Sequence, residues 1–167
     1  LLPKSDNPSF ALAQNESLPI WLAADLIAWK GSEDAYQIAK AFNSISPIDL
    51  RVNKLQASLK EVKEKFDSCG IKNKLIPNCP YGLEIKAGGG DPKSWPGYEE
   101  GNWSVQDRSS QLIAPFLASL PGERILDACA APGGKSTHVA ELINKQGEIW
   151  SVDRSYRRGQ KILANSN

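Results

Sequence analysis

A buried strand that runs into a loop of small residues and then into a helix constrains this chain more than any other feature. Residues 124–127 (Arg-Ile-Leu-Asp) have the apolar centre of a strand, and residues 128–134 are all small or ring-constrained. A helix with one apolar face is expected from about Gly134 onward. Small side chains let backbone N–H groups approach a ligand closely, so this segment predicts a site for a nucleotide-like molecule.

Two kinds of ligand fit such a loop. Gly134-Lys135-Ser136 matches the end of a phosphate-binding P-loop, but Cys129 stands where that pattern requires glycine. Asp127 at the end of the strand would also repel phosphate oxygens.

Asp153 favours the second kind of ligand. It ends the next predicted strand, residues 148–152, about twenty residues after the glycines, where a carboxylate accepts ribose hydroxyls in dinucleotide-binding folds. An adenosyl ligand without a polyphosphate fits better than a nucleoside triphosphate, and S-adenosylmethionine is the expected cofactor.

The segment Asp-Ala-Cys-Ala-Ala-Pro-Gly-Gly-Lys-Ser-Thr-His at 127–138, followed by Ser-Val-Asp at 151–153, resembles the RNA (cytosine-5) methyltransferases. In particular, it is similar to the bacterial ribosomal RNA small subunit methyltransferase B (Sun/Fmu) group. Residues 95–107 and 109–111 resemble the family segment that leads into the methyltransferase fold, and Arg-Val-Asn at 51–53 resembles the strand that opens its small RNA-binding domain. The likeness covers roughly residues 45–165, and the first forty residues match only loosely.

This resemblance implies a set of cofactor-binding residues. Gly133 and Gly134 would let the backbone approach the methionine part, Lys135 would meet its carboxylate, and Asp153 would bind the ribose. The alternatives are a solvent-facing Lys135, an N-cap role for Asp153 and a surface charge at Arg158, which matches an arginine of the family pattern. The full predicted set is Cys129, Ala130, Ala131, Pro132, Gly133, Gly134, Lys135, Asp153 and Arg158.

The family reaction depends on a cysteine thiolate that attacks C6 of cytosine, with a second cysteine assisting release. Cys129 lies in the cofactor loop and is not expected to be that nucleophile. In the family both cysteines belong to later Pro-Cys and Thr-Cys motifs, and this chain ends at Asn167 before either. We therefore expect no catalytic residue in this chain and no activity from it alone. His138 is expected to be a neutral helix residue.

The composition is typical of a globular protein and does not indicate a binding partner by itself. The formal net charge is +1, although residues 51–74 carry seven basic side chains against three acidic ones. That basic run is either a solvated helix face or a weak RNA-binding surface. The three cysteines lack metal-site spacing and no long apolar run is present, so we expect a cytoplasmic monomer without metal or membrane attachment. The chain contains no Met, so upstream residues are expected to be missing.

The expected fold class is α/β: a small α+β RNA-binding module followed by the first half of a Rossmann-like doubly wound sheet. We expect a linker or mobile arm over residues 1–16 and a helical segment over 17–44, capped by Ser17 and interrupted at Gly31. The module would cover residues 45–105, with a glycine-rich loop at 88–92. Residues 106–167 would begin the methyltransferase domain, with a helix over 109–120 kinked at Pro115.

The leading interpretation is part of an S-adenosylmethionine-dependent RNA 5-methylcytosine methyltransferase acting on small-subunit ribosomal RNA. The main alternative is a non-catalytic RNA-binding fragment in which residues 45–105 are intact. A P-loop nucleotide hydrolase ranks third, since Cys129 and Asp127 disfavour it.

Overall fold

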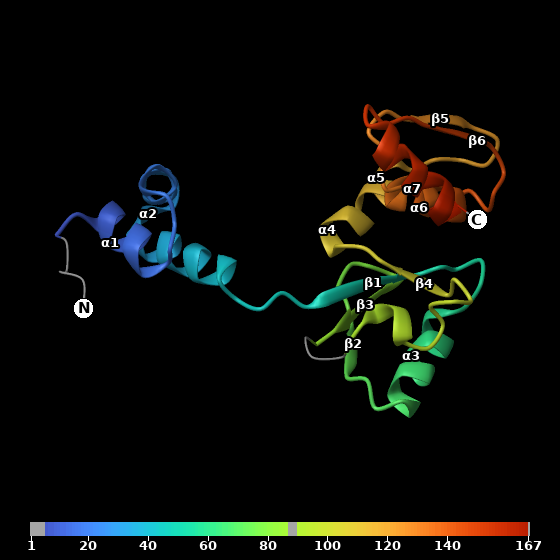
Figure 1. The fold of residues 1–167 in the computed structure, drawn as a ribbon, viewed down its shortest axis with the longest axis horizontal. Coiled ribbons are helices and arrows are strands. Elements are labelled where there is room, and N and C mark those ends of the chain that lie inside the picture. Colours follow the sequence, from blue (N-terminus) through green and yellow to red (C-terminus); the bar gives the residue numbers. More distant parts are fainter. Residues whose placement is uncertain (1–5, 87–89, 167) are drawn as a thin grey trace. The chain divides into compact units, whose positions relative to one another are not determined.

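The computed structural model describes residues 6–86 and 90–166. The chain divides into two compact units, Leu1–Ser46 and Pro47–Asn167 (Figure 1). In this described part, no helix combines the length and apolarity that a bilayer crossing requires. The expected glycine-rich loop falls partly on residues 87–89, outside the described residues, and is followed by a 3₁₀ turn at Pro92–Ser94.

The first unit begins with helix α1, Pro8–Asn15, where the sequence predicted a linker or mobile arm. That prediction was wrong for these residues. The Asn7 side chain accepts hydrogen bonds from the N–H groups of Ser9 and Phe10, and Pro8 occupies the first helical turn. Asn and Pro are common in loops, yet both are also favoured at a helix start.

Helix α2, Ile20–Phe42, forms the rest of the first unit and packs on α1. Gly31 has a φ of 78° inside α2 and kinks it, which agrees with the interruption expected there. Ser17 does not cap α2, because it adopts a φ of 55° and the cap position falls on Pro19. The core of this unit consists of small and apolar side chains from both helices: Leu12, Ala13, Ala23, Leu26, Ala35 and Ala39.

The second unit begins with a four-stranded antiparallel sheet in the order β2-β3-β1-β4. Its strands are β1 (Ile48–Val52), β2 (Asn73–Leu75), β3 (Gly82–Ile85) and β4 (Trp103–Val105). Helix α3, Leu59–Ser68, starts with a capping box in which Ser58 and Glu61 bond each other's backbone N–H. The strands and helix agree with the small α+β module expected from the sequence.

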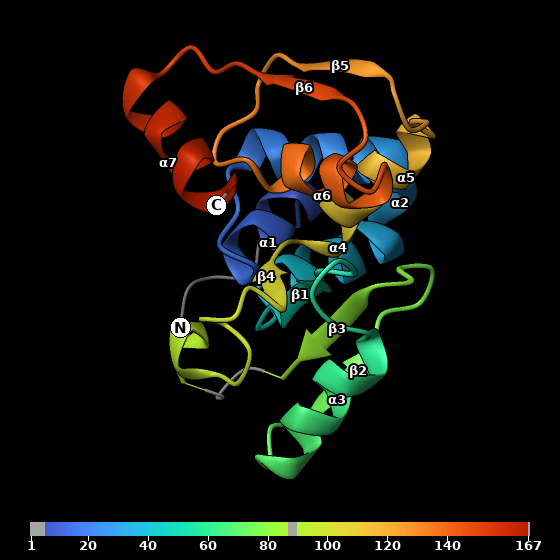
Figure 2. The same ribbon diagram turned by 90° about the vertical axis from the view of Figure 1, so that its right-hand side faces the viewer.

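The apolar face of this sheet forms the largest core cluster of the second unit. Leu50 and Val52 of β1 lie on this face with Leu83 and Ile85 of β3, because alternate residues of a strand share a face. They pack against α3 and a group of aromatic rings, through Val62, Phe66, Trp95 and Trp103. The helices α4 and α6 lie on the opposite side of the sheet from α3 (Figure 2).

A parallel strand pair completes the second unit. Strand β5, Arg124–Asp127, pairs with β6, Glu148–Ser151, and helix α6, Gly134–Leu142, connects them. Helix α7, Tyr156–Ser166, follows β6. The strand-helix-strand order predicted for residues 124–152 is therefore present, and α7 adds a second helix.

The helix expected over residues 109–120 is two short helices, α4 (Arg108–Gln111) and α5 (Ile113–Leu117). Asp107 caps α4, accepting from the N–H groups of Ser109 and Ser110. The break lies at Leu112, before Pro115, because a proline ring clashes with the carbonyl four residues earlier. Ala118, with a φ of 51°, ends α5 three residues earlier than predicted.

Candidate cofactor-binding site

Residues 128–134, which run from the end of β5 to the first residue of α6, are called the cofactor loop from here on. It leaves β5 after Asp127 and reaches α6 at Gly133, whose φ of 109° places it in the left-handed region that glycine tolerates. Among the described residues, no side chain caps the start of α6. The predicted loop residues therefore do form a strand-to-helix turn. The backbone N–H groups at the start of α6 are not capped by any described side chain, which leaves them available to a ligand.

Asp127 holds the two ends of this turn together. Its Oδ2 accepts a 2.7 Å hydrogen bond from the Ser136 hydroxyl, and its Oδ1 lies 3.3 Å from the Cys129 nitrogen. Ser136 is buried in the first turn of α6. The sequence indicated Asp127 only as a charge that repels phosphate, and its bond to Ser136 was not predicted.

Asp153 lies beside the cofactor loop, as the parallel pairing of β5 and β6 requires. Its Oδ2 accepts from the Ala131 N–H at 3.2 Å, and its Oδ1 accepts from the Ser155 N–H at 2.9 Å. The bond from Ser155, reinforced by that from Ala131, holds the pKa of Asp153 below its usual range. The side chain is 6% exposed, and its two oxygens still have lone pairs for further donors.

Arg158 meets the same loop residue from α7. Its Nη2 donates to the Ala131 carbonyl at 2.9 Å and lies 3.8 Å from Asp153 Oδ2. Both polar groups of Ala131 are therefore held, one by Asp153 and one by Arg158. Ala130 and Ala131 also pack on Ile162 of α7.

Lys135 is exposed in the first turn of α6 and lines a cavity of about 180 Å³. Asp127, Ala128 and Ser136 contribute to the same lining, together with apolar side chains of α5, β5, α6 and β6. This volume is smaller than the roughly 300 Å³ of a small ligand pocket, and the lining includes neither Asp153 nor Arg158. The predicted site residues are thus brought to one edge of the sheet but not into one closed cavity.

The cysteines lie apart from each other and hold no bridge. Cys69 and Cys129 are exposed, whereas Cys79 is buried and burial raises the pKa of its thiol. Within residues 6–86 and 90–166, no group of three or more His, Cys, Asp or Glu side chains could hold a metal ion.

A parallel strand-loop-helix-strand unit, with small residues in the loop and an acid after the second strand, defines the Rossmann-like class of cofactor-binding folds. The family model "16S rRNA methyltransferase RsmB/F" matches residues 114–167, and the ferredoxin-like domain model of the RsmF/B-like methyltransferases matches residues 18–89. The chain belongs to the RsmB/F methyltransferase family.

Curated relatives agree with this assignment. A probable ribosomal RNA small subunit methyltransferase B of Synechocystis is 36% identical over 157 residues, which is 94% of this chain and 35% of the relative. The corresponding probable enzyme of Bacillus subtilis is 34% identical over 151 residues, or 89% of this chain and 33% of the relative. The chain thus spans about a third of the length of these relatives.

Solved structures share the fold. A methyltransferase homologue from Pyrococcus horikoshii matches 96% of this chain and 52% of its own length, with a TM-score of 0.84 and 25% identity. NSun6 from the same organism, crystallised with SFG, matches 90% of this chain and 62% of its own, with a TM-score of 0.76 and 18% identity. The expected fold class, a small α+β domain followed by part of a methyltransferase fold, is confirmed.

Proposed function

We propose that this chain is the RNA-binding module and cofactor loop of a cytoplasmic, S-adenosylmethionine-dependent methyltransferase that modifies cytosine C5 in small-subunit ribosomal RNA. The observation that carries the proposal is the meeting of Asp153 with the cofactor loop at Ala131. The names of the curated relatives support ribosomal RNA as the substrate, and the family name supports methyl transfer.

Each predicted site residue would contact a different part of the cofactor, or act on it through the loop. The backbone of residues 129–134 would follow the methionine part, and Lys135 would neutralise its carboxylate at the start of α6. Asp153 would accept the ribose hydroxyls with its remaining lone pairs. Arg158 would act on the cofactor through the loop, since its guanidinium holds the Ala131 carbonyl.

Replacement of Asp153 by asparagine tests the ribose role. Asp153→Asn keeps the shape of the side chain but removes its charge, so the dissociation constant for S-adenosylmethionine should rise about ten- to a hundredfold. Isothermal calorimetry on this chain, and on a version extended to the length of its curated relatives, measures the change.

Asp107→Asn is the matched control, because Asp107 also accepts backbone N–H groups, but those of Ser109 and Ser110 at the start of α4. An unchanged constant in Asp153→Asn, or an equal rise in both variants, would contradict the assignment. Filter binding of ribosomal RNA with and without cofactor separates this proposal from a non-catalytic RNA-binding module. Only in a cofactor-dependent enzyme should S-adenosylmethionine change the affinity for RNA.

A further inference from the structure

The small module's sheet is buried on both faces, and the two faces differ in chemistry. One face packs on α3 through apolar side chains, as described above. The other face carries Asp49 and Arg51 of β1 and Glu84 of β3, all buried, and turns toward α4 and α6 (Figure 1). An arginine between Leu50 and Val52 in a buried strand is costly unless its donors are satisfied, so its partners are informative.

Arg51 is 2% exposed, and it reaches across to the start of α6. Its Nη1 donates to the Gly134 carbonyl at 2.6 Å and to Gln106 Oε1 at 2.5 Å. Its Nη2 donates to Thr137 Oγ1 at 3.1 Å and to Glu141 Oε1 at 2.7 Å. One side chain of β1 therefore holds the last residue of the cofactor loop and the first two turns of α6.

The ion pair between Arg51 and Glu141 is buried, and burial restricts the geometry in which the two side chains can meet. Burial lowers the pKa of Arg51 and raises the pKa of Glu141, and each charge counteracts the shift of the other. A buried ion pair gives little net stability compared with apolar packing, but its forked geometry admits few alternatives. Gln106 is fixed in turn, because its backbone bonds Asp49 and Gln111.

Four side chains hold the region from residue 128 to 137. Asp153 and Arg158 hold Ala131, and Asp127 holds Ser136, all from within the methyltransferase part. Arg51 holds Gly134 from the small module. We propose that Arg51 is a positioning residue, which orders the cofactor loop from the small module before any ligand binds and so increases the affinity for the cofactor.

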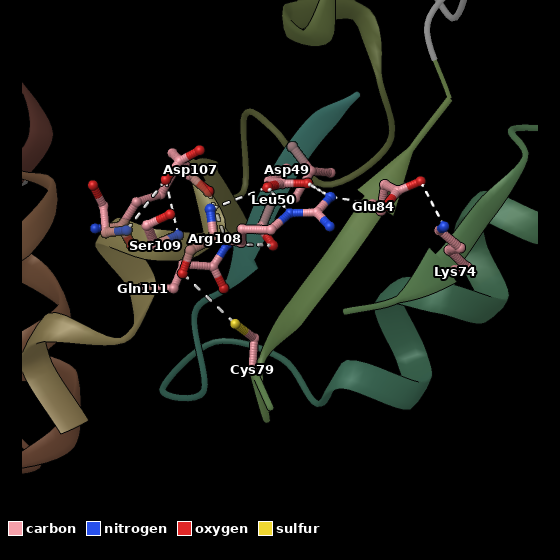
Figure 3. Close-up of polar contacts among 11 residues, drawn as sticks. Asp49, Leu50, Lys74, Cys79, Glu84, Asp107, Arg108, Ser109 and Gln111 are labelled. Carbon is pink, nitrogen blue, oxygen red and sulfur yellow. Dashed lines mark hydrogen bonds and ion pairs between the residues drawn. The ribbon is translucent and has the colours of Figure 1, made fainter. Parts of the chain in front are cut away.

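Arg108 provides a matched comparison on the same polar face (Figure 3). Its Nε and Nη2 donate to Asp49, and Nη2 also donates to Glu84, which Lys74 pairs from the other side. Arg108 thus ties α4 to the sheet with contacts of the same kind as those of Arg51. The contacts described for its side chain include none to the cofactor loop or α6.

Amide hydrogen exchange of the whole chain, without ligand, tests the proposal. Arg51→Lys keeps a positive charge near Glu141 but cannot hold the Gly134 carbonyl, Gln106 and Thr137 together. We expect at least about tenfold faster exchange in residues 128–137, with β1 and β3 still protected. Arg108→Lys should accelerate exchange in residues 109–112 and leave residues 128–137 at the wild-type rate.

Thr137→Val is a milder second variant, in case Arg51→Lys does not fold. It removes one acceptor of Arg51 at nearly constant side-chain volume. Wild-type exchange of residues 128–137 in both Arg51→Lys and Thr137→Val would overturn the proposal. Equal acceleration of every segment in both variants would overturn it too, because it would indicate a purely structural role.

The effect on affinity rests on the proposed function, and calorimetry with S-adenosylmethionine measures it. Arg51→Lys should raise the dissociation constant about tenfold and Arg108→Lys should not. If the wild-type protein bound no cofactor in any version, the proposed function would fail at that step. The exchange experiment would still decide whether Arg51 orders the loop.

Discussion

His138 is a buried histidine on α6, and the residues described leave both of its ring nitrogens without a hydrogen-bond partner. It faces Cys79 and Gln111 around a cavity of about 10 Å³. Burial, with the nearby charges of Arg51 and Lys54, lowers the pKa of His138 to about 4. The neutral helix residue expected from the sequence is consistent with this environment, since a second cation beside Arg51 would be repelled.

The stability of the chain should therefore fall in mild acid because of His138. An unfolded histidine takes up a proton as the pH drops through about 6.5, whereas the buried one stays neutral until about 4. Protonation then favours the unfolded state, and between these values the loss should reach about 2–3 kcal/mol. Urea unfolding at several pH values measures it.

His138→Leu is the comparison for that measurement. It should remove the part of the pH dependence between about 6.5 and 4 while leaving the carboxylate contributions in place. Identical pH dependence in the two proteins would mean that His138 titrates normally in the folded state.

Among the elements, the parallel pair β5 and β6 depends on a close backbone approach at Gly147. Gly147 has a φ of 140°, and a Cβ built on it would lie 2.6 Å from the Glu123 carbonyl. That carbonyl accepts from the Glu148 N–H, next to the first residue pair of the strands, Arg124 and Glu148. Only glycine fits here without displacing the start of the sheet.

Gly147→Ala should destabilise the chain by about 2–5 kcal/mol, since backbone strain adds to a backbone clash. Gly122→Ala is the control, because Gly122 has a φ of 91° in the same region but nothing within 4 Å of an added Cβ. It should cost only about 1–2 kcal/mol. Urea unfolding curves give both values, and equal losses would argue against the clash.

For the whole molecule, the outer face of the β5–β6 pair is apolar and open. Leu126 and Trp150 are register partners and are 67% and 64% exposed, and Val152 continues the same face. Phe116 and Leu120, which precede β5 in the sequence, are exposed as well. Parallel sheets are normally covered on both faces, so this pair of strands exposes a face of the kind that is usually buried.

The chain should therefore bind an apolar dye such as 8-anilinonaphthalene-1-sulfonate in its folded state. The double variant Leu126→Lys/Trp150→Lys should reduce the dye fluorescence several-fold. Trp21→Lys should leave it near the wild-type level, because Trp21 is 66% exposed but belongs to α2 of the first unit. A reduction of the same size in Trp21→Lys would show that exposed tryptophan alone, and not this face, binds the dye.

The sequence by itself determined the features that depend on neighbours along the chain. The strand ending at Asp127, the small residues before Gly134, the acid at Asp153 and the cap at Asp107 all follow from local backbone and side-chain chemistry. The assignment of cofactor roles to these residues stays a prediction, as does the domain boundary at 105–106, which falls inside the second unit.

Only the tertiary structure decided what depends on distant partners. Helix α1 is short and gains its stability from packing on α2, so the sequence around Asn7 and Pro8 by itself predicted a linker. Arg51 meets Gln106, Gly134, Thr137 and Glu141, which lie 55 to 90 residues away. A buried charge between two apolar residues signals that a partner exists. Which partner it meets is set by the packing of the whole unit, because long-range contacts carry no local pattern.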